Sequence, residues 1–426
     1  MNNDVVLKFK DLLSFVFNNE HSSFYRDKYQ KAGFMPNADF QSLEDIKRIP
    51  LLTRKELAEE DCSRLLFVPD QEAEIVSPTS GSTTGKPFIT FHSIKDRLVP
   101  HPDIEMPQNK ALVLMSPFRA PITSLAVKQA KAKHVLMGDI FNLPASCYLA
   151  SKLGVNHIST TPALLLILKK YLVNYPDLEK NLRSFVIGGE LVTPEKKKML
   201  QELYPDKEIF MIYGLSEAGG INARQCRTLA GRSREVLFHP GVETCYFEII
   251  NPETEKEVPF GERGELIITN FKNRATPLIR YRTGDSASFK ENDCPCGAPG
   301  PLLEFYGRIN YDIIKVGGIE LRSDMLEKPL MNLSSYLKDC FEVHVHEAFA
   351  GNKPKIQITL NLSLKEGVGD SPAIRKKIEE EFLENWRLSP RFNLRKAVET
   401  GLFGFPQINF VQFPLTGKAR RVLILN

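Results

Sequence analysis

Apolar residues recur at helical spacing in the first part of the chain. Val5, Phe9, Leu12 and Val16 follow one another at steps of three and four residues, which places them on one face of a helix. Gly33 then interrupts this pattern, because glycine favours turns. We therefore predict that the first sixty residues are mainly helical.

Beyond Pro78, short apolar runs alternate with amphipathic segments. Four runs have the length and composition of buried strands, at residues 111–115, 134–138, 157–160 and 184–189. Strands that are separated by helices pair in parallel through crossover connections. This part of the chain is therefore predicted to form a parallel sheet with crossover helices.

From about Glu235 the pattern changes to hairpins. The apolar runs 242–250 and 265–269 flank a turn-rich segment at 251–264. Two strands joined by a short polar connection pair in antiparallel fashion. We predict an antiparallel β portion that completes a large α/β domain over residues 1–307.

A smaller unit is predicted from residue 308 to residue 426. Residues 355–364 alternate strictly between polar and apolar, as in a strand with one buried face. Ser371 and Pro372 then indicate the start of a helix, as an N-cap residue and a first helical residue. On that helix a four-residue stripe is predicted to be core, and it consists of Ile374, Ile378, Phe382 and Trp386. The fold class is therefore a large α/β domain and a small α+β domain.

Composition narrows the function further. The chain has 426 residues with 56 Lys and Arg against 52 Asp and Glu, a net charge of +4 that is not concentrated in one segment. This balance does not favour nucleic acid or a membrane surface as a partner. Charged residues at positions 4, 8, 10 and 11 break up the apolar core that a secretion signal needs, so we expect a cytoplasmic protein without membrane attachment. Seven cysteines are too few for a disulfide scaffold.

The sharpest local signal is the segment SPTSGSTTGKPF at residues 77–88. Its small residues let backbone N–H groups approach a polyphosphate, and its hydroxyls and one lysine add donors and charge. The spacing differs from a Walker A loop, because Gly81 to Gly85 is one residue too short. The residues predicted to contact phosphate are Ser80, Gly81, Ser82, Thr83, Thr84, Gly85 and Lys86.

Further motifs follow in a consistent order. They are GGE at 188–190, YGLSE at 213–217, YRTGD at 281–285, GRINYDIIKVGG at 307–318 and PLTGKARR at 414–421. With these motifs the chain resembles the adenylate-forming superfamily of acyl-CoA ligases, adenylation domains and luciferases, and most of all its phenylacetate-CoA ligase-like branch. The resemblance extends over nearly the whole chain.

The resemblance implies that a carboxylate attacks the α-phosphate of ATP to form an acyl-adenylate. It implies that Glu217 holds Mg²⁺, that Ser216 contacts the α-phosphate, and that Asp285 accepts hydrogen bonds from the ribose. The remaining nucleotide contacts that it implies come from Gly188, Gly189, Glu190, Tyr213, Gly214 and Arg308.

Lys418 matches the mobile catalytic lysine of the family. The resemblance implies that the small domain rotates after adenylation, withdraws this lysine and admits coenzyme A. The hinge is expected within residues 310–312. The acyl pocket is expected near residues 116–121, 159–163 and 219–221.

A second cluster consists of Cys226, His239, Cys294 and Cys296. Three thiolates and one imidazole satisfy tetrahedral zinc, and the branch that the chain resembles can carry such residues in these segments. The alternative is four unrelated reduced side chains. We interpret the other cysteines as packing residues, at positions 62, 147, 245 and 340.

The predicted function is an ATP-dependent acid-CoA ligase that forms AMP, with a small carboxylic acid, ATP and coenzyme A as substrates and with Mg²⁺ and Zn²⁺ as metals. One alternative passes the acyl group to a carrier protein or an amine. Another is a non-catalytic nucleotide-binding homologue, because the phosphate loop and the hinge each contain one extra residue. A homodimer is allowed by the sequence.

Overall fold

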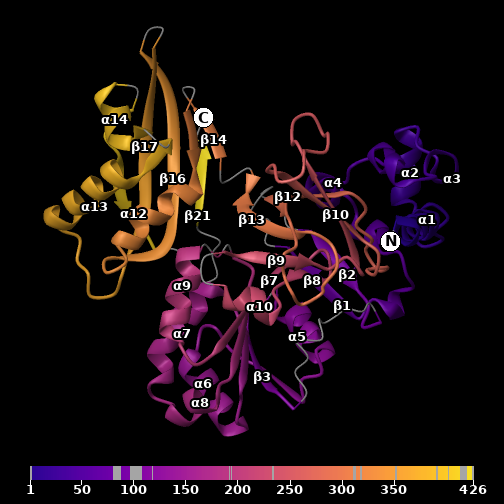
Figure 1. The fold of residues 1–426 in the computed structure, drawn as a ribbon, viewed down its shortest axis with the longest axis horizontal. Coiled ribbons are helices and arrows are strands. Elements are labelled where there is room, and N and C mark those ends of the chain that lie inside the picture. Colours follow the sequence, from indigo (N-terminus) through magenta and orange to yellow (C-terminus); the bar gives the residue numbers. More distant parts are fainter. Residues whose placement is uncertain are drawn as a thin grey trace. The chain divides into compact units, whose positions relative to one another are not determined.

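The computed structural model divides the chain into two compact units, residues 1–305 and 306–426 (Figure 1). The structure describes residues 2–424 except 80–87, 96–107, 118, 191, 193, 233–234, 310–312, 317–318, 351–352, 390–391, 402 and 413–419. The predicted domain boundary, after residue 307, lies two residues beyond the division between the units.

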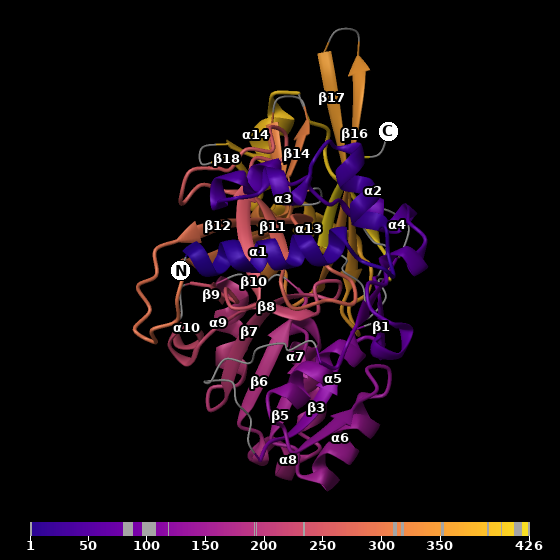
Figure 2. The same cartoon turned by 90° about the vertical axis from the view of Figure 1, so that its right-hand side faces the viewer.

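The first unit begins with a helical segment, as predicted. Phe9, Leu12 and Val16 on α1 are fully buried, and the Phe9 ring packs edge-on against Tyr246 and Phe271 with centroid separations of 5.3 and 5.1 Å. Figure 2 shows α1 lying in front of the large sheet. The helices of this segment are α1 (Asn2–Phe17), α2 (Phe24–Lys31), α3 (Pro36–Asp39), η1 (Leu43–Arg48), α4 (Arg54–Glu59), η2 (Cys62–Leu65) and η3 (Asp70–Glu72).

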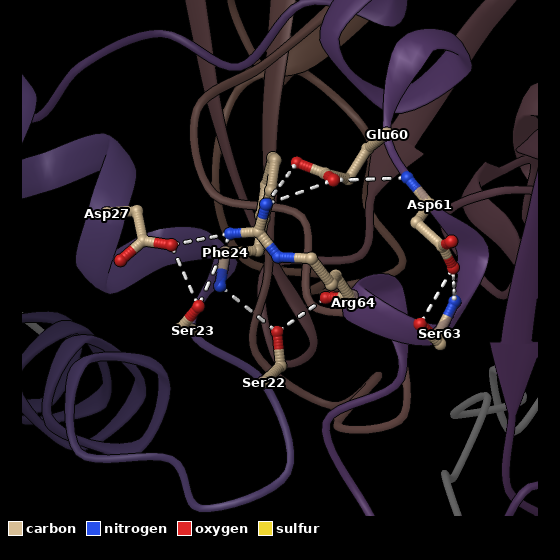
Figure 3. A network of polar contacts seen from close by, with 8 residues as sticks. All are labelled: Ser22, Ser23, Phe24, Asp27, Glu60, Asp61, Ser63 and Arg64. Atoms are coloured by element: carbon tan, nitrogen blue, oxygen red, sulfur yellow. Dashed lines mark hydrogen bonds and ion pairs between the residues drawn. The ribbon is translucent and has the colours of Figure 1, made fainter.

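Arg64 connects two of these helices on the surface (Figure 3). Its guanidinium donates to Asp27 on α2 at 2.5 Å and to Glu60 at 3.1 Å, and it contacts Ser23 at 3.3 Å. Asp61 caps η2 through the Ser63 N–H at 2.8 Å. These polar contacts fix the segment between α2 and η2, although exposed ion pairs of this kind add little free energy.

The predicted parallel and antiparallel regions form one continuous sheet of eleven strands. Their order is β10-β11-β12-β13-β9-β8-β7-β6-β5-β3-β4. Pairing is parallel from β7 through β6, β5 and β3 to β4, and antiparallel where β8, β9, β10 and β11 are joined to their neighbours.

The four strands predicted beyond Pro78 are confirmed with ends that differ by at most one residue. They are β3 (Lys110–Leu114), β4 (His134–Met137), β5 (His157–Thr160) and β6 (Ser184–Gly188). The other strands of the sheet are β7 (Glu208–Leu215), β8 (Gly220–Arg224), β9 (Leu237–Pro240), β10 (Cys245–Ile250), β11 (Gly264–Asn270), β12 (Tyr281–Lys290) and β13 (Leu302–Arg308). A separate antiparallel pair consists of β1 (Ile75–Pro78) and β2 (Ile89–His92).

Helices cover both faces of the parallel strands. On β3, Ala111 and Val113 share a core cluster with α5, whereas Leu112 and Leu114 belong to the larger cluster that includes α6 and α7. This division follows from the two-residue period of a strand. The crossover helices are α5 (Ala120–Gln129), α6 (Leu143–Leu153), α7 (Pro162–Leu172), α8 (Pro176–Asn181) and α9 (Pro194–Leu203), and the short helix α10 (Arg227–Gly231) connects the antiparallel strands β8 and β9. Within the described residues, no helix is both long enough and apolar enough to cross a membrane.

The second unit is a small α+β body built on a four-stranded sheet of order β20-β17-β16-β21. The predicted alternation on β17 is confirmed, because Ile356, Ile358, Leu360 and Leu362 are all buried. The predicted core stripe of α13 is confirmed as well, with Trp386 fully buried at its end. The strands are β14 (Ile313–Val316), β15 (Ile319–Arg322), β16 (Leu337–Ala350), β17 (Lys353–Leu364), β18 (Arg387–Ser389), β19 (Phe392–Asn393), β20 (Gln407–Phe410) and β21 (Arg420–Ile424), and the helices are η5 (Ser323–Leu326), α12 (Glu327–Asn332), α13 (Pro372–Asn385) and α14 (Leu394–Glu399).

Candidate active site

The YGLSE motif lies at the end of β7, where the chain turns back into β8. Tyr213 and Gly214 belong to the strand, and Ser216 and Glu217 directly follow it. The hairpin is very tight, because a Cβ atom on Gly214 would lie 2.5 Å from the carbonyl oxygen of Gly220. Glycine is therefore required at position 214 for packing as well as for any contact with a nucleotide.

Glu217 is a buried carboxylate held by two donors. The Tyr281 hydroxyl donates to its Oε1 atom at 3.0 Å, and Nη1 of Arg54 lies 3.2 Å from the same oxygen. The first donor comes from the YRTGD motif and the second from α4, far away in the sequence. A buried carboxylate with such donors is suited to hold a cation such as Mg²⁺.

Tyr213 and Asp285 are also in contact. They are the first residue of YGLSE and the last residue of YRTGD. The Tyr213 hydroxyl donates to Asp285 Oδ2 at 2.6 Å, and its ring stacks on Phe305 with a centroid separation of 4.0 Å. Tyr281 and Asp285 are four residues apart on β12, and an irregularity in its pairing with β11 lies between them. The structure thus brings two predicted nucleotide residues into direct contact.

The GGE motif lies at the end of β6, next to β7. A Cβ atom on Gly188 would lie 2.6 Å from the side chain of Ile212, and Gly189 adopts a left-handed conformation with φ of +82°. Arg119, at the start of α5, donates to the carbonyl oxygen of Gly189 at 3.2 Å. The glycines therefore allow a close turn at the edge where β6 and β7 end, and Glu190 follows in that turn.

His92, at the end of β2, is buried near Glu217. Its ring nitrogens contact Thr90 Oγ1 at 3.1 Å and Asn273 Nδ2 at 3.3 Å. Burial lowers the pKa of His92 to about 4, although the negative charge of Glu217 acts in the opposite direction. His92 is therefore neutral near pH 7.

A small hollow adjoins His92. Its walls include the apolar side chains of Ile122, Leu125 and Ile221 together with the backbone of Gly219. Gly219 and Ile221 belong to one of the three segments that were expected to line an acyl pocket. The hollow begins two residues after Glu217, so it is next to the candidate metal ligand.

Several predicted residues lie outside the described residues. These are the phosphate loop from Ser80 to Lys86, the hinge at residues 310–312 and Lys418. Arg308 is the last residue of β13, and its side chain is also outside the described part. Ser216 is half-buried beside Glu217.

The four predicted zinc ligands come together in the first unit. The ligand atoms of Cys226, His239, Cys294 and Cys296 all lie within 4.8 Å of one another. The sulfur atoms of Cys226 and Cys294 are 3.4 Å apart, and the sulfur of Cys296 is 3.2 Å from Nε2 of His239. Two thiolates bound to one tetrahedral zinc at about 2.3 Å would lie roughly 3.8 Å apart. The donor set and its spacing fit zinc.

The other cysteines only partly follow the prediction that they are packing residues. Cys147 and Cys245 are buried, and burial raises the pKa of each thiol to about 11. Cys340 is half-buried. The prediction is wrong for Cys62, which is exposed because it begins the surface helix η2.

Three side chains near the site carried no predicted role. Arg54 lies in the segment RIPLLTRKEL at residues 48–57, which contributes to the family resemblance without implying a role for this residue. His92 lies outside the motifs, and the role of Tyr281 in holding Glu217 was not anticipated within YRTGD. The contact between Arg54 and Glu217 joins residues that are 163 positions apart.

Comparisons with known proteins agree with this geometry. Residues 125–271 match the family model of the AMP-binding enzymes. The chain is 24% identical to phenylacetate-coenzyme A ligase of Pseudomonas putida over 370 residues, which covers 79% of this chain and 77% of the relative. It is 25% identical to the enzyme of the same name from Thermus thermophilus over 396 residues, which covers 88% and 81% of the two chains.

Among solved structures, the fold matches 2-hydroxyisobutyryl-CoA ligase in the postadenylation state in complex with 2-HIB-AMP. The TM-score is 0.75 at 19% identity, and the match covers 99% of this chain and 89% of the ligase. The same ligase with 2-HIB-AMP and CoA, in its thioesterification state, matches with a TM-score of 0.63. The family match, the relatives and the fold confirm the resemblance to the adenylate-forming superfamily and to its phenylacetate-CoA ligase-like branch.

Proposed function

We propose that the chain is an AMP-forming acid-CoA ligase. The observation that carries this proposal is the meeting of two motifs about seventy residues apart, in which Tyr213 contacts Asp285 and Tyr281 contacts Glu217. An aromatic ring, two carboxylates and a turn made by glycines are the groups that a nucleotide and its metal require. The relatives named above support the same reaction class.

In the first proposed step, a carboxylate oxygen of the acid bonds to the α-phosphorus of ATP. The bond from that phosphorus to the bridging oxygen breaks, and pyrophosphate leaves with the electron pair. In the second step, the deprotonated sulfur of coenzyme A bonds to the acyl carbon, and AMP leaves. The product is a thioester.

The nucleotide contacts follow from the chemistry of each side chain. Asp285 is an acceptor for ribose hydroxyl groups, and Tyr213 offers an aromatic face to the adenine. Ser216 is proposed to donate to the α-phosphate. Glu217 would hold Mg²⁺, which supplies positive charge to the triphosphate when it is bound.

Cations are needed because two anions meet in the first step. At about 4 Å and an effective dielectric constant near 20, one pair of like unit charges repels by roughly 4 kcal/mol. We propose that Lys86 of the phosphate loop and Lys418 of the second unit offset this repulsion. In this proposal, residues 308–426 form the domain that brings Lys418 to the phosphates.

We propose that the hollow beside His92 receives the acyl group of the acid. It adjoins Glu217 through Gly219, and the apolar side chains of Ile122, Leu125 and Ile221 line part of it. The relatives act on phenylacetate and 2-hydroxyisobutyrate according to their names, so the choice of acid in this chain is left to the experiment. A carrier protein or an amine as the acceptor, and assembly as a homodimer, stay predictions.

The test is carboxylate-dependent exchange between ATP and pyrophosphate, measured with a panel of acids. The exchange should disappear in Lys418→Ala and persist in Lys376→Ala, a matched control because Lys376 is an exposed lysine on α13. Formation of AMP should then require coenzyme A, rather than a carrier protein or an amine. If no acid in the panel supports exchange, the proposal is wrong and a non-catalytic nucleotide-binding homologue is the better description.

We also propose that Cys226, His239, Cys294 and Cys296 bind one structural zinc. The cluster lies among apolar side chains of the first unit, away from the contacts of Glu217. Metal analysis of the purified protein should give about one zinc per chain, and Cys294→Ser/Cys296→Ser should lose it. Cys147→Ser is the control, because that cysteine lies outside the cluster; folded wild-type protein without zinc would contradict the proposal.

A further inference from the structure

The zinc cluster and the nucleotide residues lie on opposite faces of the short strand β9. Leu237 shares a buried cluster with the three cysteines of the predicted zinc site, and His239, two residues further along the strand, is the fourth predicted ligand. Phe238 lies between them in the sequence and belongs to the large core cluster. This division follows from the two-residue period of a strand. One strand therefore contacts both sites.

The neighbouring strand β13 is divided in the same way. Leu302 packs in the cluster of the cysteines, whereas Leu303 belongs to the large core cluster. Leu303 is paired with Phe238 across the two strands, and residues that are directly opposite each other point to the same face of a sheet. Phe305 lies two residues after Leu303 and packs against the same core cluster. The two strands thus present one face to the cysteines and the other to Phe305.

A row of three aromatic rings leads from β9 to the nucleotide residues. The ring centroids of Phe238 and Phe305 are 5.2 Å apart, with the rings nearly perpendicular at 79°. Phe305 in turn stacks on Tyr213 at 4.0 Å, and the Tyr213 hydroxyl donates to Asp285 at 2.6 Å. A shift of Phe238 would therefore move the ring that is proposed to contact the adenine.

The predicted zinc ligands come from three segments that meet at β9. Cys226 lies just after β8, His239 belongs to β9, and Cys294 and Cys296 lie before β13. These strands are neighbours in the sheet, in the order β13-β9-β8. Bonds from all three segments to one tetrahedral metal would fix β9 between its two neighbours.

We infer that β9 couples the zinc site to the nucleotide site, with Phe238 as the positioning residue. This inference rests on the proposed function, both for the zinc and for the nucleotide. His239 holds the strand from one face, and Phe238 on the other face supports the rings of Phe305 and Tyr213. Coupling between two binding sites is reciprocal, so each ligand should strengthen the binding of the other by the same factor.

The test is the binding of AMP to the purified protein, measured by calorimetry before and after zinc is removed with a chelator. AMP contains the adenine and the ribose but lacks the triphosphate, which itself binds metal ions. Loss of zinc should weaken AMP binding by about fivefold or more. Saturating AMP should raise the affinity for zinc by the same factor, measured by competition with a chromophoric chelator.

Phe238→Leu separates this row of rings from a general effect of zinc on stability. The variant should still bind zinc and AMP, but its affinity for AMP should change less than about twofold when zinc is removed. Phe289→Leu is the matched control and should keep the wild-type coupling, because Phe289 on β12 stacks on Phe260 instead. If Phe238→Leu does not fold, Phe305→Leu interrupts the same row one ring further on and should likewise abolish the coupling.

The outcomes separate this inference from the proposals on which it rests. If the purified protein contains no zinc, the zinc proposal is wrong, and if it does not bind AMP, the ligase proposal is wrong; the inference is then wrong as well. The inference alone is overturned if both ligands bind and the affinity for AMP does not depend on zinc. It is also overturned if Phe238→Leu keeps the full wild-type coupling, because zinc would then act by another route.

Discussion

The first unit contains two buried arginine–glutamate pairs that differ in how completely the protein surrounds them. Arg280 donates through Nε and Nη2 to Glu248, and through Nη1 to the carbonyl oxygens of Lys47 and Ile49 at 3.3 and 2.8 Å. Arg54 has one ion-pair contact with Glu217 and a buried Nε without a partner in the described residues. The first pair is completed by the fold, whereas the second has an unmet donor within the described part of the chain.

This difference separates a pair that stabilises the fold, Arg280–Glu248, from a pair at the proposed active site, Arg54–Glu217. Arg280 connects β10 to the end of η1 and so fixes the chain just before Leu52 and Arg54. Burial raises the pKa of Glu248, and Arg280 counteracts this rise. The Arg280–Glu248 pair therefore holds the N-terminal segment in place. That segment carries Arg54, which pairs with Glu217.

The largest expected effect is that of Arg280→Met on stability. The substitution leaves Glu248 and two backbone carbonyl groups buried without their donors, so the free energy of unfolding should fall by about 3–5 kcal/mol. Denaturant unfolding followed by circular dichroism measures it. Arg48→Met should change stability by less than about 0.5 kcal/mol, and an equally small change for Arg280→Met would remove the distinction between the pairs.

The second prediction concerns two buried histidines, one at the site and one in the parallel sheet. Burial lowers the pKa of both His92 and His157 to about 4. Below pH 6.5 the unfolded chain binds protons that the folded chain does not, so stability is lost as the pH falls from about 6.5 to about 4. Each histidine contributes up to about 3 kcal/mol to this loss.

Unfolding at pH 7 and at pH 4.5 tests this prediction. His157→Gln should lose less stability between the two pH values than the wild type, because glutamine does not titrate. His21→Gln serves as the control, since His21 is exposed on the helical N-terminal segment. Identical losses in His157→Gln and the wild type would show that this buried ring does not govern the acid sensitivity.

Tyr281→Phe is expected to have a smaller effect on activity than Arg54→Met. It removes one neutral hydrogen bond to Glu217 and leaves the ion pair, which corresponds to about 0.5–1.5 kcal/mol or roughly a two- to thirteenfold loss in kcat/KM. Pyrophosphate exchange measures this loss. If Tyr281→Phe is more damaging than Arg54→Met, the hydroxyl rather than the guanidinium is the principal support of Glu217.

The smallest effect is expected for Arg64→Met, which removes the surface network in Figure 3. The guanidinium and its partner Asp27 are 39% and 55% exposed, so the ion pair contributes at most about 1 kcal/mol. The difference in unfolding free energy between the wild type and Arg64→Met should be smaller at high salt, because salt screens the ion pair of the wild type. A loss as large as that of Arg280→Met would mean that exposure does not separate the two classes of ion pair.

The sequence predicted those features that a local pattern specifies. Period-two runs predicted the strands, and the stripe ending at Trp386 predicted the core face of α13. The family resemblance assigned Tyr213 and Asp285 to one nucleotide, but it did not predict the direct hydrogen bond between them. The prediction of one zinc site also depended on this resemblance, and its residues are Cys226, His239, Cys294 and Cys296.

Features that depend on long-range packing were not predicted. No local pattern indicates that Arg54 faces Glu217, because the two residues are brought together by the pairing of Leu52 with β12. No local pattern predicted that the parallel and antiparallel regions share one sheet. The two regions are joined by β8 and β9, whose antiparallel pairing is a long-range feature. Cys62 was misassigned because composition does not reveal which face of a short surface helix a residue occupies.

The attachment of Leu52 to β12 has a consequence for how the catalytic centre could fail. Local unfolding of the N-terminal helices would detach Arg54 while the large sheet stayed intact. Brief proteolysis that cuts before residue 60 should therefore abolish turnover well before the protein loses its cooperative unfolding transition. The helical segment therefore supplies part of the core, through Phe9, Leu12 and Val16, as well as a side chain of the proposed active site.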